Sequence, residues 1–325
     1  MDYARLGTTA LKVSRICLGC MTFGSKSWRD WMLEEDEARP IIRHALDAGI
    51  THFDTADYYS LGASERLLGA ALKDFRIARE TVVISTKVGL PVGDDPNQRG
   101  LSRKHIRHSI DASLKRLGTD YIDIYQIHRF DPDTPMEEIV DALDDVVRAG
   151  KARHVGASTM YAWQFARLTA LAARRANLRF ASMQAHYNLV YREEEREMIP
   201  LCAAEGVAVL PWSPLARGLL ARGAAADLSP RARADKAAAR FYNHDSDAAV
   251  IAAVNRIAQA RGVTPAQVAI AWLLHRPEVP AAIIGATKIS HIDDAVRAVA
   301  LKLTQDELAE LTAPYRAHPV IGHHA

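Results

Sequence analysis

The 325-residue sequence is poor in cysteine and has almost no net charge. Its three cysteines, Cys17, Cys20 and Cys202, are too few for the disulfide framework of a small secreted protein, and an odd number is typical of a reducing compartment. The formal charge of +2 comes from 41 basic and 39 acidic residues, which are spread along the chain without a basic block. Neither nucleic acid nor a membrane surface is therefore expected as a partner.

Long apolar runs are also missing. Residues 1–6 contain no apolar signal-peptide core, and no run approaches the ~20 residues that span a bilayer. These absences predict a cytoplasmic protein. Cys17 and Cys20 have the spacing of a redox pair, but they lie in an apolar strand-like run, where positions three apart point to opposite faces. We expect two buried, unreactive thiols.

Short β-rich runs alternate with helical patterns along most of the chain. Strands are predicted over 15–18, 51–54, 81–86, 121–127, 152–156, 181–185, 207–211 and 282–285. Helices are predicted over 35–48, 64–73, 102–117, 136–148, 161–174, 193–205 and 268–275. Strict alternation predicts a parallel sheet, and eight strands predict closure into a (β/α)8 TIM barrel. A doubly wound nucleotide-binding sheet is disfavoured, because no Gly-x-Gly-x-x-Gly follows the first strand.

Several segments exceed this minimal barrel. A β-hairpin is predicted over residues 3–13, and residues 24–33 enlarge the first strand-to-helix loop. A long connection over 217–247 follows the seventh strand and leads into an extra helix that ends near residue 260. A last helix is predicted over 306–312, before an irregular tail. Connections as long as 217–247 are typical of lids and binding segments, with a surface loop as the alternative.

Polar side chains follow three successive predicted strands. Asp54, Lys87 and His128 stand at these strand ends, and the loop after Asp54 adds Tyr58 and Tyr59. Taken singly, each residue has a structural alternative, such as a helix cap, an exposed strand end or a packing aromatic. Because active sites of β/α barrels lie at the C-terminal ends of the strands, the set as a whole predicts a catalytic site.

The set fits the reduction of a carbonyl group. Hydride addition places negative charge on the carbonyl oxygen, so a proton donor has to lie beside it. A free tyrosine, with a pKa of about 10, is a weak acid at neutral pH. A neighbouring lysine ammonium lowers that pKa, a carboxylate keeps the lysine charged, and a neutral imidazole supports the developing charge. This reasoning does not choose between Tyr58 and Tyr59.

Several segments closely resemble the aldo-keto reductase family. The resemblance covers nearly the whole chain in order, and its motifs lie at 53–59, 85–87, 125–128, 156–158, 183–184, 210–218 and 284–288. Residues 6–14 and 319–322 resemble the subgroup related to potassium-channel β subunits and bacterial reductases. The resemblance implies one reductase domain over 1–325, with NADPH-dependent reduction of aldehydes or ketones as its reversible activity. It implies a catalytic tetrad of Asp54, Tyr59, Lys87 and His128, with Tyr59 as the proton donor.

The resemblance also implies that NADP(H) binds across the barrel mouth without a Rossmann fold. Ser158 and Gln184 would bind the carboxamide, and Trp212 would stack on the nicotinamide ring. The pyrophosphate would lie along Ser213, Leu215, Arg217 and Gly218. The adenosine end would be surrounded by Gly285, Thr287, Lys288, His291 and Asp294. The sequence departs from the family at Thr159, where many relatives have asparagine, and at Thr287, where many have arginine.

The substrate is a small carbonyl compound that the sequence outlines only in part. Candidate pocket residues are Phe23, Trp28, Trp31 and Arg129. The aromatic rings favour an apolar or aromatic aldehyde, and the arginine permits an anionic group.

Two other functions stay open at this point. One is an NADPH-binding regulatory subunit with slow turnover. The other is a cofactor-free lyase with Lys87 as a Schiff-base nucleophile. No metal site is expected, because His52 and Asp54 lack a convergent third ligand. The sequence does not predict an oligomeric state.

Overall fold

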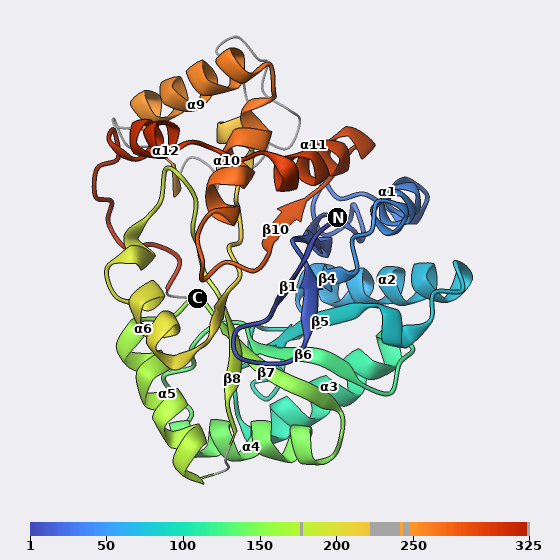
Figure 1. Cartoon of the computed structure of the whole chain (residues 1–325). Helices are drawn as coiled ribbons and strands as arrows, with labels where there is room; N and C mark the ends of the chain where they lie inside the picture. The colour runs from blue at the N-terminus through green and yellow to red at the C-terminus, as the bar shows by residue number, and fades with distance from the viewer. Residues whose placement is uncertain (176–177, 222–240, 243–246, 324–325) are drawn as a thin grey trace.

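The computed structural model describes residues 1–175, 178–221, 241–242 and 247–323. Within them, eight parallel strands form one curled sheet in the order β10, β3, β4, β5, β6, β7, β8 and β9 (Figure 1). Their bounds are β3 Ile16–Gly19, β4 His52–Asp54, β5 Val83–Val88, β6 Ile122–Ile127, β7 Ala152–Ser158, β8 Phe180–Gln184, β9 Ala208–Val209 and β10 Ala282–Gly285.

The first and last strands of the sequence close the sheet. β10 pairs with β3, with Ala282 opposite Ile16. The backbone N–H of Ile283 donates to Pro211 O, just beyond β9, at 3.0 Å. The predicted (β/α)8 barrel is confirmed.

Helices follow the strands around the barrel, as Figure 1 shows. The α-helices are α1 Glu35–Asp47, α2 Ala63–Asp74, α3 Arg103–Leu117, α4 Met136–Arg148, α5 Ala162–Arg175, α6 Met198–Glu205, α9 Asp247–Arg261, α10 Pro265–Leu274, α11 Ile289–Ala300 and α12 Gln305–Thr312. Short 3₁₀ turns are η1 Cys20–Thr22, η2 Tyr59–Gly62, η3 Arg79–Thr81, η4 Glu193–Glu195 and η5 Ala216–Ala221. The extra helices predicted after the seventh strand and near the C-terminus are α9 and α12, and both are confirmed. The rest of the 217–247 connection lies largely outside the described residues.

Local sequence signals explain several helix ends. The Ser102 hydroxyl accepts the His105 N–H at 3.3 Å and begins α3. Thr264 does the same for the Gln267 N–H at 3.3 Å in α10. These side chains satisfy N–H groups that have no partner in the first helical turn. Gly118 ends α3 with φ 65°, a left-handed conformation that favours glycine.

Two strand boundaries differ from the prediction. The strand predicted over 81–86 begins only at Val83, because Arg79–Thr81 forms η3 and the Arg79 guanidinium binds Tyr121 O at 2.9 Å. The strand predicted over 207–211 pairs with β8 only over Ala208–Val209.

Two helical predictions are also corrected. The helix predicted over 193–205 is divided into η4 and α6, and Glu197 between them has non-helical angles of φ −141° and ψ −48°. Helix α11 was not predicted at all. Its buried face carries Ile292, Ala295 and Val299 at helical spacing, but Lys288 at its N-cap makes no side-chain cap that would mark the start.

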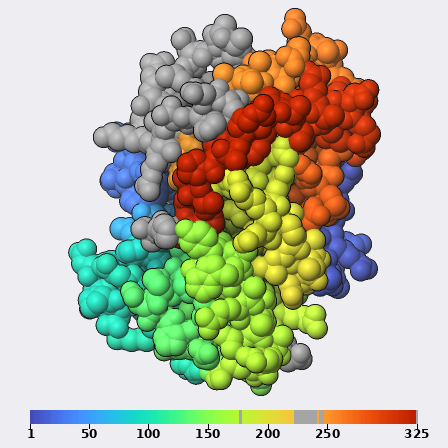
Figure 2. All heavy atoms as spheres, turned by 90° about the vertical axis from the view of Figure 1, so that its left-hand side faces the viewer, coloured from blue at the N-terminus to red at the C-terminus, as the bar shows by residue number. Residues whose placement is uncertain are grey.

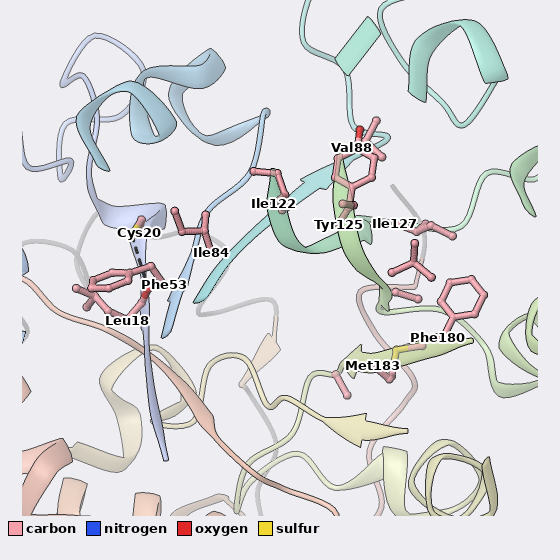
Figure 3. Packing of buried hydrophobic residues seen from close by; sticks show 14 of the residues in the cluster. Leu18, Cys20, Phe53, Ile84, Val88, Ile122, Tyr125, Ile127, Phe180 and Met183 are labelled. Atoms are coloured by element: carbon pink, nitrogen blue, oxygen red, sulfur yellow. Dashed lines mark hydrogen bonds between the residues drawn. The ribbon is translucent and has the colours of Figure 1, made fainter. Parts of the chain in front are cut away.

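Strand side chains that face the helices form the main hydrophobic core (Figure 3). Leu18, Phe53 and Ile84 lie in this cluster with at most 1% of their surface exposed. Cys17 and Cys20 are buried and free, and burial raises the pKa of each thiol. The expectation of two buried thiols is confirmed.

The N-terminal hairpin, β1 Tyr3–Arg5 and β2 Lys12–Ser14, packs at the N-terminal end of the barrel. Leu6 and Val13 are fully buried in a second cluster with inward-facing strand residues such as Ile124. The hairpin therefore closes one end of the barrel and leaves the other end as its mouth. No helix in the described ranges is long and apolar enough to cross a membrane.

The C-terminal tail, residues 313–323, crosses the surface beside η4, where Figure 2 shows it in red. The Tyr315 hydroxyl donates to Glu193 Oε1 at 2.6 Å, and the His318 N–H donates to the same oxygen at 2.7 Å. Near the tail end, the His323 ring stacks on Tyr161 with centroids 4.7 Å apart. The tail is thus held along the barrel side as far as the loop that follows β7.

Candidate active site

Three strand ends bring the predicted catalytic residues to one edge of the sheet. Asp54 is the last residue of β4, Lys87 is the fifth of six residues in β5, and His128 follows β6 directly. In the sheet register, Asp54 lies opposite Ser85 and Lys87 lies opposite Gln126. Since neighbouring parallel strands end at the same edge, these side chains share the barrel mouth.

Lys87 is the centre of the group. Its Nζ donates to Asp54 Oδ2 at 2.6 Å, to Thr55 O at 2.8 Å and to the Tyr59 hydroxyl at 3.1 Å. The side chain has no exposed surface, and an ammonium group has three protons to donate. Tyr58, in contrast, contacts the Trp28 ring edge-on at 5.5 Å. The structure therefore distinguishes two tyrosines that the residue chemistry left equivalent.

The second oxygen of Asp54 is also bound. Gln126 Nε2 donates to Asp54 Oδ1 at 3.1 Å, and Gln184 Nε2 donates to it at 2.8 Å. The carboxylate is therefore fixed by Lys87 on one oxygen and by two amides on the other. A buried charge of this kind is retained only when it is paired and hydrogen-bonded.

The charges of Lys87 and Tyr59 follow from these contacts. Burial disfavours the ammonium, but Asp54 and Tyr59 outweigh it and raise the pKa of Lys87 to about 12. Burial raises the pKa of Tyr59 above its ordinary value, and Lys87 opposes this shift. The expectation of a lowered tyrosine pKa is therefore wrong for this structure, since burial is the larger effect. Tyr59 holds its proton at neutral pH.

His128 is buried beside the two tyrosines. Its ring meets Tyr59 edge-on at 5.7 Å and Tyr58 at 6.2 Å. Its buried Nδ1 has no hydrogen-bond partner among the residues that the structure describes. Burial, together with the charges of Lys87 and Arg129, lowers the pKa of His128 well below its ordinary value. The imidazole is therefore neutral at neutral pH.

Ser158 and Gln184 lie side by side at the ends of β7 and β8. The Ser158 hydroxyl donates to Gln184 O at 3.0 Å, and both residues are almost fully buried. Because the amide nitrogen of Gln184 is bound to Asp54, Gln184 connects the hydrogen bonds around Lys87 to Ser158 at the end of β7.

Trp212 belongs to a stack of aromatic rings. One face of Trp212 lies on His186 with centroids 4.1 Å apart and planes at 10°, and His186 lies on Tyr191 at 4.1 Å. The indole N–H donates to Thr159 Oγ1 at 2.9 Å. The stack leaves only the opposite face of Trp212 for a ligand ring. Thr159, where the sequence departs from the family pattern, has a role in holding that ring.

The segment after Trp212 has an unusual backbone. Ser213, Ala216 and Arg217 have φ values of 53°, 46° and 56°, which non-glycine residues adopt only at a cost of order 1–3 kcal/mol. Ser213 O accepts Asn188 Nδ2 at 2.9 Å, and this bond fixes the turn. Left-handed residues within a turn direct backbone N–H groups to one side, an arrangement that binds anions.

The predicted adenosine segment leads into a helix. Lys288 is the N-cap of α11, and both Lys288 and His291 are exposed. The Thr287 N–H donates to His291 Nδ1 at 3.3 Å, while Asp294 is bound to Gln267 at 2.7 Å. The N–H groups at a helix N-terminus favour a phosphate, and the two basic side chains add to that preference.

The four predicted substrate residues do not lie together. Trp28 contacts the ring of Tyr58, and Arg129 follows His128 at the mouth. Trp31 is half-buried in the same loop as Trp28. Phe23 has no exposed surface and lies in the main core. Its backbone forms an isolated parallel β-bridge with Leu33. We therefore assign Phe23 to the core instead of the pocket wall.

Comparison with known proteins identifies the family of this barrel. A model of the aldo/keto reductase family matches residues 15–316. The chain belongs to this family. Versiconal hemiacetal acetate reductase of Aspergillus parasiticus is 48% identical to it, with 97% of each chain covered. Putative aryl-alcohol dehydrogenases of Schizosaccharomyces pombe and Saccharomyces cerevisiae are 43% and 41% identical, over 98% and 96% of this chain and 97% and 96% of theirs.

Membership of the aldo/keto reductase family makes the chain an oxidoreductase of carbonyl compounds, in a family that generally uses nicotinamide cofactors. The closer likeness to potassium-channel β subunits stays a prediction. The lyase alternative is disfavoured, because a nucleophilic lysine needs a lowered pKa and that of Lys87 is raised.

Sequence reasoning missed two residues of this aldo/keto reductase site. Gln126 binds Asp54, and it lies on β6 two positions before His128, which directly follows this strand. Residues two apart on a strand face the same side, so the spacing pointed to Gln126. His186, which supports Trp212, has no comparable signal, because Trp212 and Tyr242, two of its partners, lie far from it in the sequence.

Proposed function

We propose that this aldo/keto reductase reversibly reduces aldehydes or ketones to alcohols, with NADPH as the hydride source and Tyr59 as the proton donor. The observation that carries the proposal is the buried contact of 3.1 Å between Lys87 Nζ and the Tyr59 hydroxyl, with Asp54 behind the lysine. Residues 1–325 act together as one domain in this proposal. The pairing of β10 with β3, which joins the two ends of the sequence, supports that view.

In this proposal, each side chain of the catalytic group has a separate role in the reaction. The Tyr59 hydroxyl donates its proton to the carbonyl oxygen of the substrate as negative charge develops there. Lys87, kept charged by Asp54, stabilises the phenolate that remains on Tyr59. The neutral imidazole of His128 orients the carbonyl oxygen and supports the same charge.

The residues on the other side of the mouth fit NADP(H). Ser158 and Gln184 would hold the carboxamide, and the face of Trp212 opposite His186 would stack on the nicotinamide, which supplies the hydride when bound. The left-handed turn would hold the pyrophosphate through Ser213, Leu215, Arg217 and Gly218. Gly285, Thr287, Lys288, His291 and Asp294 would surround the adenosine end at the start of α11. The exposed charge of Lys288 favours NADPH over NADH.

The pocket wall favours an aromatic or apolar carbonyl compound. Trp28 and Tyr58 form an aromatic pair beside His128, and Trp31 lies in the same loop as Trp28. Putative aryl-alcohol dehydrogenase is also the name carried by three of the relatives. We propose benzaldehyde and its derivatives as the first compounds to test.

The test compares Tyr59→Phe with Tyr58→Phe and the unchanged protein. Tyr59→Phe is expected to lower kcat for aldehyde reduction by about 10²–10⁴-fold, because general acid catalysis is lost. Quenching of tryptophan fluorescence by NADPH should be unchanged in both variants, and Tyr58→Phe should keep most of its turnover. Reduction by Tyr59→Phe at the unchanged rate would refute the mechanism. Tight NADPH binding with very slow turnover of every carbonyl would favour the regulatory subunit.

A further inference from the structure

Arg129 carries a positive charge that no carboxylate neutralises within the described residues. Its Nη1 donates to His128 O at 2.6 Å and lies 3.5 Å from Ser158 Oγ, and its Nε and Nη2 make no hydrogen bond within the same ranges. Arg79, which is also partly buried, is neutralised in the usual way, since its guanidinium binds the Asp123 carboxylate at 2.5 Å and three further oxygens. Charged side chains that leave water are normally paired.

The position of Arg129 places this charge at the reacting end of the mouth. Arg129 directly follows His128 and contacts Ser158. Its charge adds to the lowering of the His128 pKa by burial, and it opposes the rise of the Tyr59 pKa that burial causes. Lys87 is already neutralised by Asp54. With a neutral His128 and a protonated Tyr59, the group therefore keeps one positive charge in excess.

The cofactor phosphates do not account for this charge. In the proposed binding mode they lie along 213–218 and at the start of α11, whereas Arg129 is beside Ser158 at the nicotinamide end. An anion that reaches Arg129 therefore belongs to the substrate. A guanidinium whose Nε–Nη2 edge is unused suits a carboxylate, which that edge binds through two parallel hydrogen bonds.

We propose that Arg129 is a specificity residue that binds a carboxylate group of the carbonyl substrate, so that oxo acids and carboxylated aromatic aldehydes are the preferred substrate class. This inference rests on the proposed reductase function, because it identifies a second chemical group on the carbonyl compound that the enzyme would reduce. Nε and Nη2 make the two contacts, while the carbonyl oxygen lies between Tyr59 and His128.

The experiment compares 4-carboxybenzaldehyde with its neutral methyl ester, which differ in charge but share the aromatic aldehyde. The variants are Arg129→Met and Arg129→Lys, with Arg153→Met as a control, since Arg153 is an exposed arginine at the start of β7, away from the mouth. Arg129→Met is expected to lower kcat/KM for the acid by about 10–100-fold, mainly through KM, because a charged hydrogen bond is lost. The ester should lose less, because it has no carboxylate for the guanidinium to bind, so the ratio of kcat/KM for the acid to that for the ester should fall by about tenfold. Arg129→Lys should recover part of this fall.

The outcomes separate this inference from the proposed function. An equal loss for the acid and the ester, or a preference of the unchanged protein for the ester, would overturn the carboxylate site. Absence of turnover with both compounds would refute the reductase proposal instead. Calorimetric titration with benzoate in the presence of NADP⁺ then decides on Arg129 alone: saturable binding that Arg129→Met abolishes supports the site, and binding unchanged in Arg129→Met, or none to the unchanged protein, overturns it.

Discussion

The two sides of the barrel mouth are built in different ways. Over β4 to β6, charged and polar side chains bind one another out of contact with water, as Lys87 and Asp54 do at 2.6 Å. Over β9 to β10, backbone turns and exposed cations replace this network, with Ala216 in a left-handed conformation and Lys288 open to solvent at the start of α11.

This difference indicates which part of the site is already hydrogen-bonded before a ligand binds. A network that is already hydrogen-bonded needs no reorganisation when charge develops on a substrate. A phosphate site needs accessible N–H groups and cations, because the anion itself completes it. Substitutions on the first side should therefore affect the folded state and turnover, while those on the second side should affect ligand affinity alone.

The strongest test of this contrast is Lys87→Met. The substitution leaves Asp54 as a buried carboxylate without its cation, so the free energy of unfolding should fall by about 3–5 kcal/mol. Urea denaturation measures this loss, and turnover should disappear with it. Lys104→Met, which removes an exposed lysine on α3, is the control and should change stability by less than about 0.5 kcal/mol. Equal stability of the two variants would show that the first side is not a preassembled unit.

On the second side, Lys288→Met should leave the melting temperature unchanged, because the side chain is exposed. Loss of one charge-assisted contact to the 2′-phosphate should raise the Kd for NADPH about tenfold and leave that for NADH nearly constant. Fluorescence titration of both cofactors measures the two values. Exposed Lys302, which lies just beyond the C-terminal end of α11, supplies the control Lys302→Met. If the Kd for NADH rose equally, the result would contradict a contact between Lys288 and the 2′-phosphate.

The smallest effect concerns pH. Displacement of water by neighbouring atoms and the charge of Lys288 lower the pKa of His291, so the free protein holds a neutral ring at neutral pH. A bound phosphate favours the protonated ring, so the contribution of His291 to NADPH affinity should grow as pH falls from about 8 to about 6. The ratio of the Kd of His291→Gln to that of the unchanged protein should rise about threefold over this range. A ratio that is constant with pH would contradict the expected contact.

The two sides also differ in how well the sequence predicted them. Asp54, Lys87 and His128 were identified because alternating strands and helices predict where strand ends meet, and this rule depends only on local patterns. The choice of Tyr59 over Tyr58 needed the family resemblance. The structure adds a physical reason, since Lys87 lies 3.1 Å from one hydroxyl while the other tyrosine packs against Trp28.

What the sequence could not predict depends on contacts between distant segments. Phe23 was expected in the pocket, but pairing with Leu33 places it in the core. The bond from the Gln184 amide nitrogen to Asp54, 130 residues earlier, was not predicted either, while the cofactor contact of Gln184 stays a prediction. The net pKa shift of Tyr59 also required the extent of its burial, which no local pattern reports.

The course of the C-terminal tail has a practical consequence for protein engineering. A side chain placed at Gly322 would have its Cβ 3.9 Å from Thr159 Cγ2, the residue that holds Trp212. Met1, in contrast, lies against Gly49, before β4 and thus at the hairpin end of the barrel. An immobilising linker attached to a side chain at residue 322 would therefore lie beside the mouth, and one attached at Met1 would lie at the hairpin end, away from it.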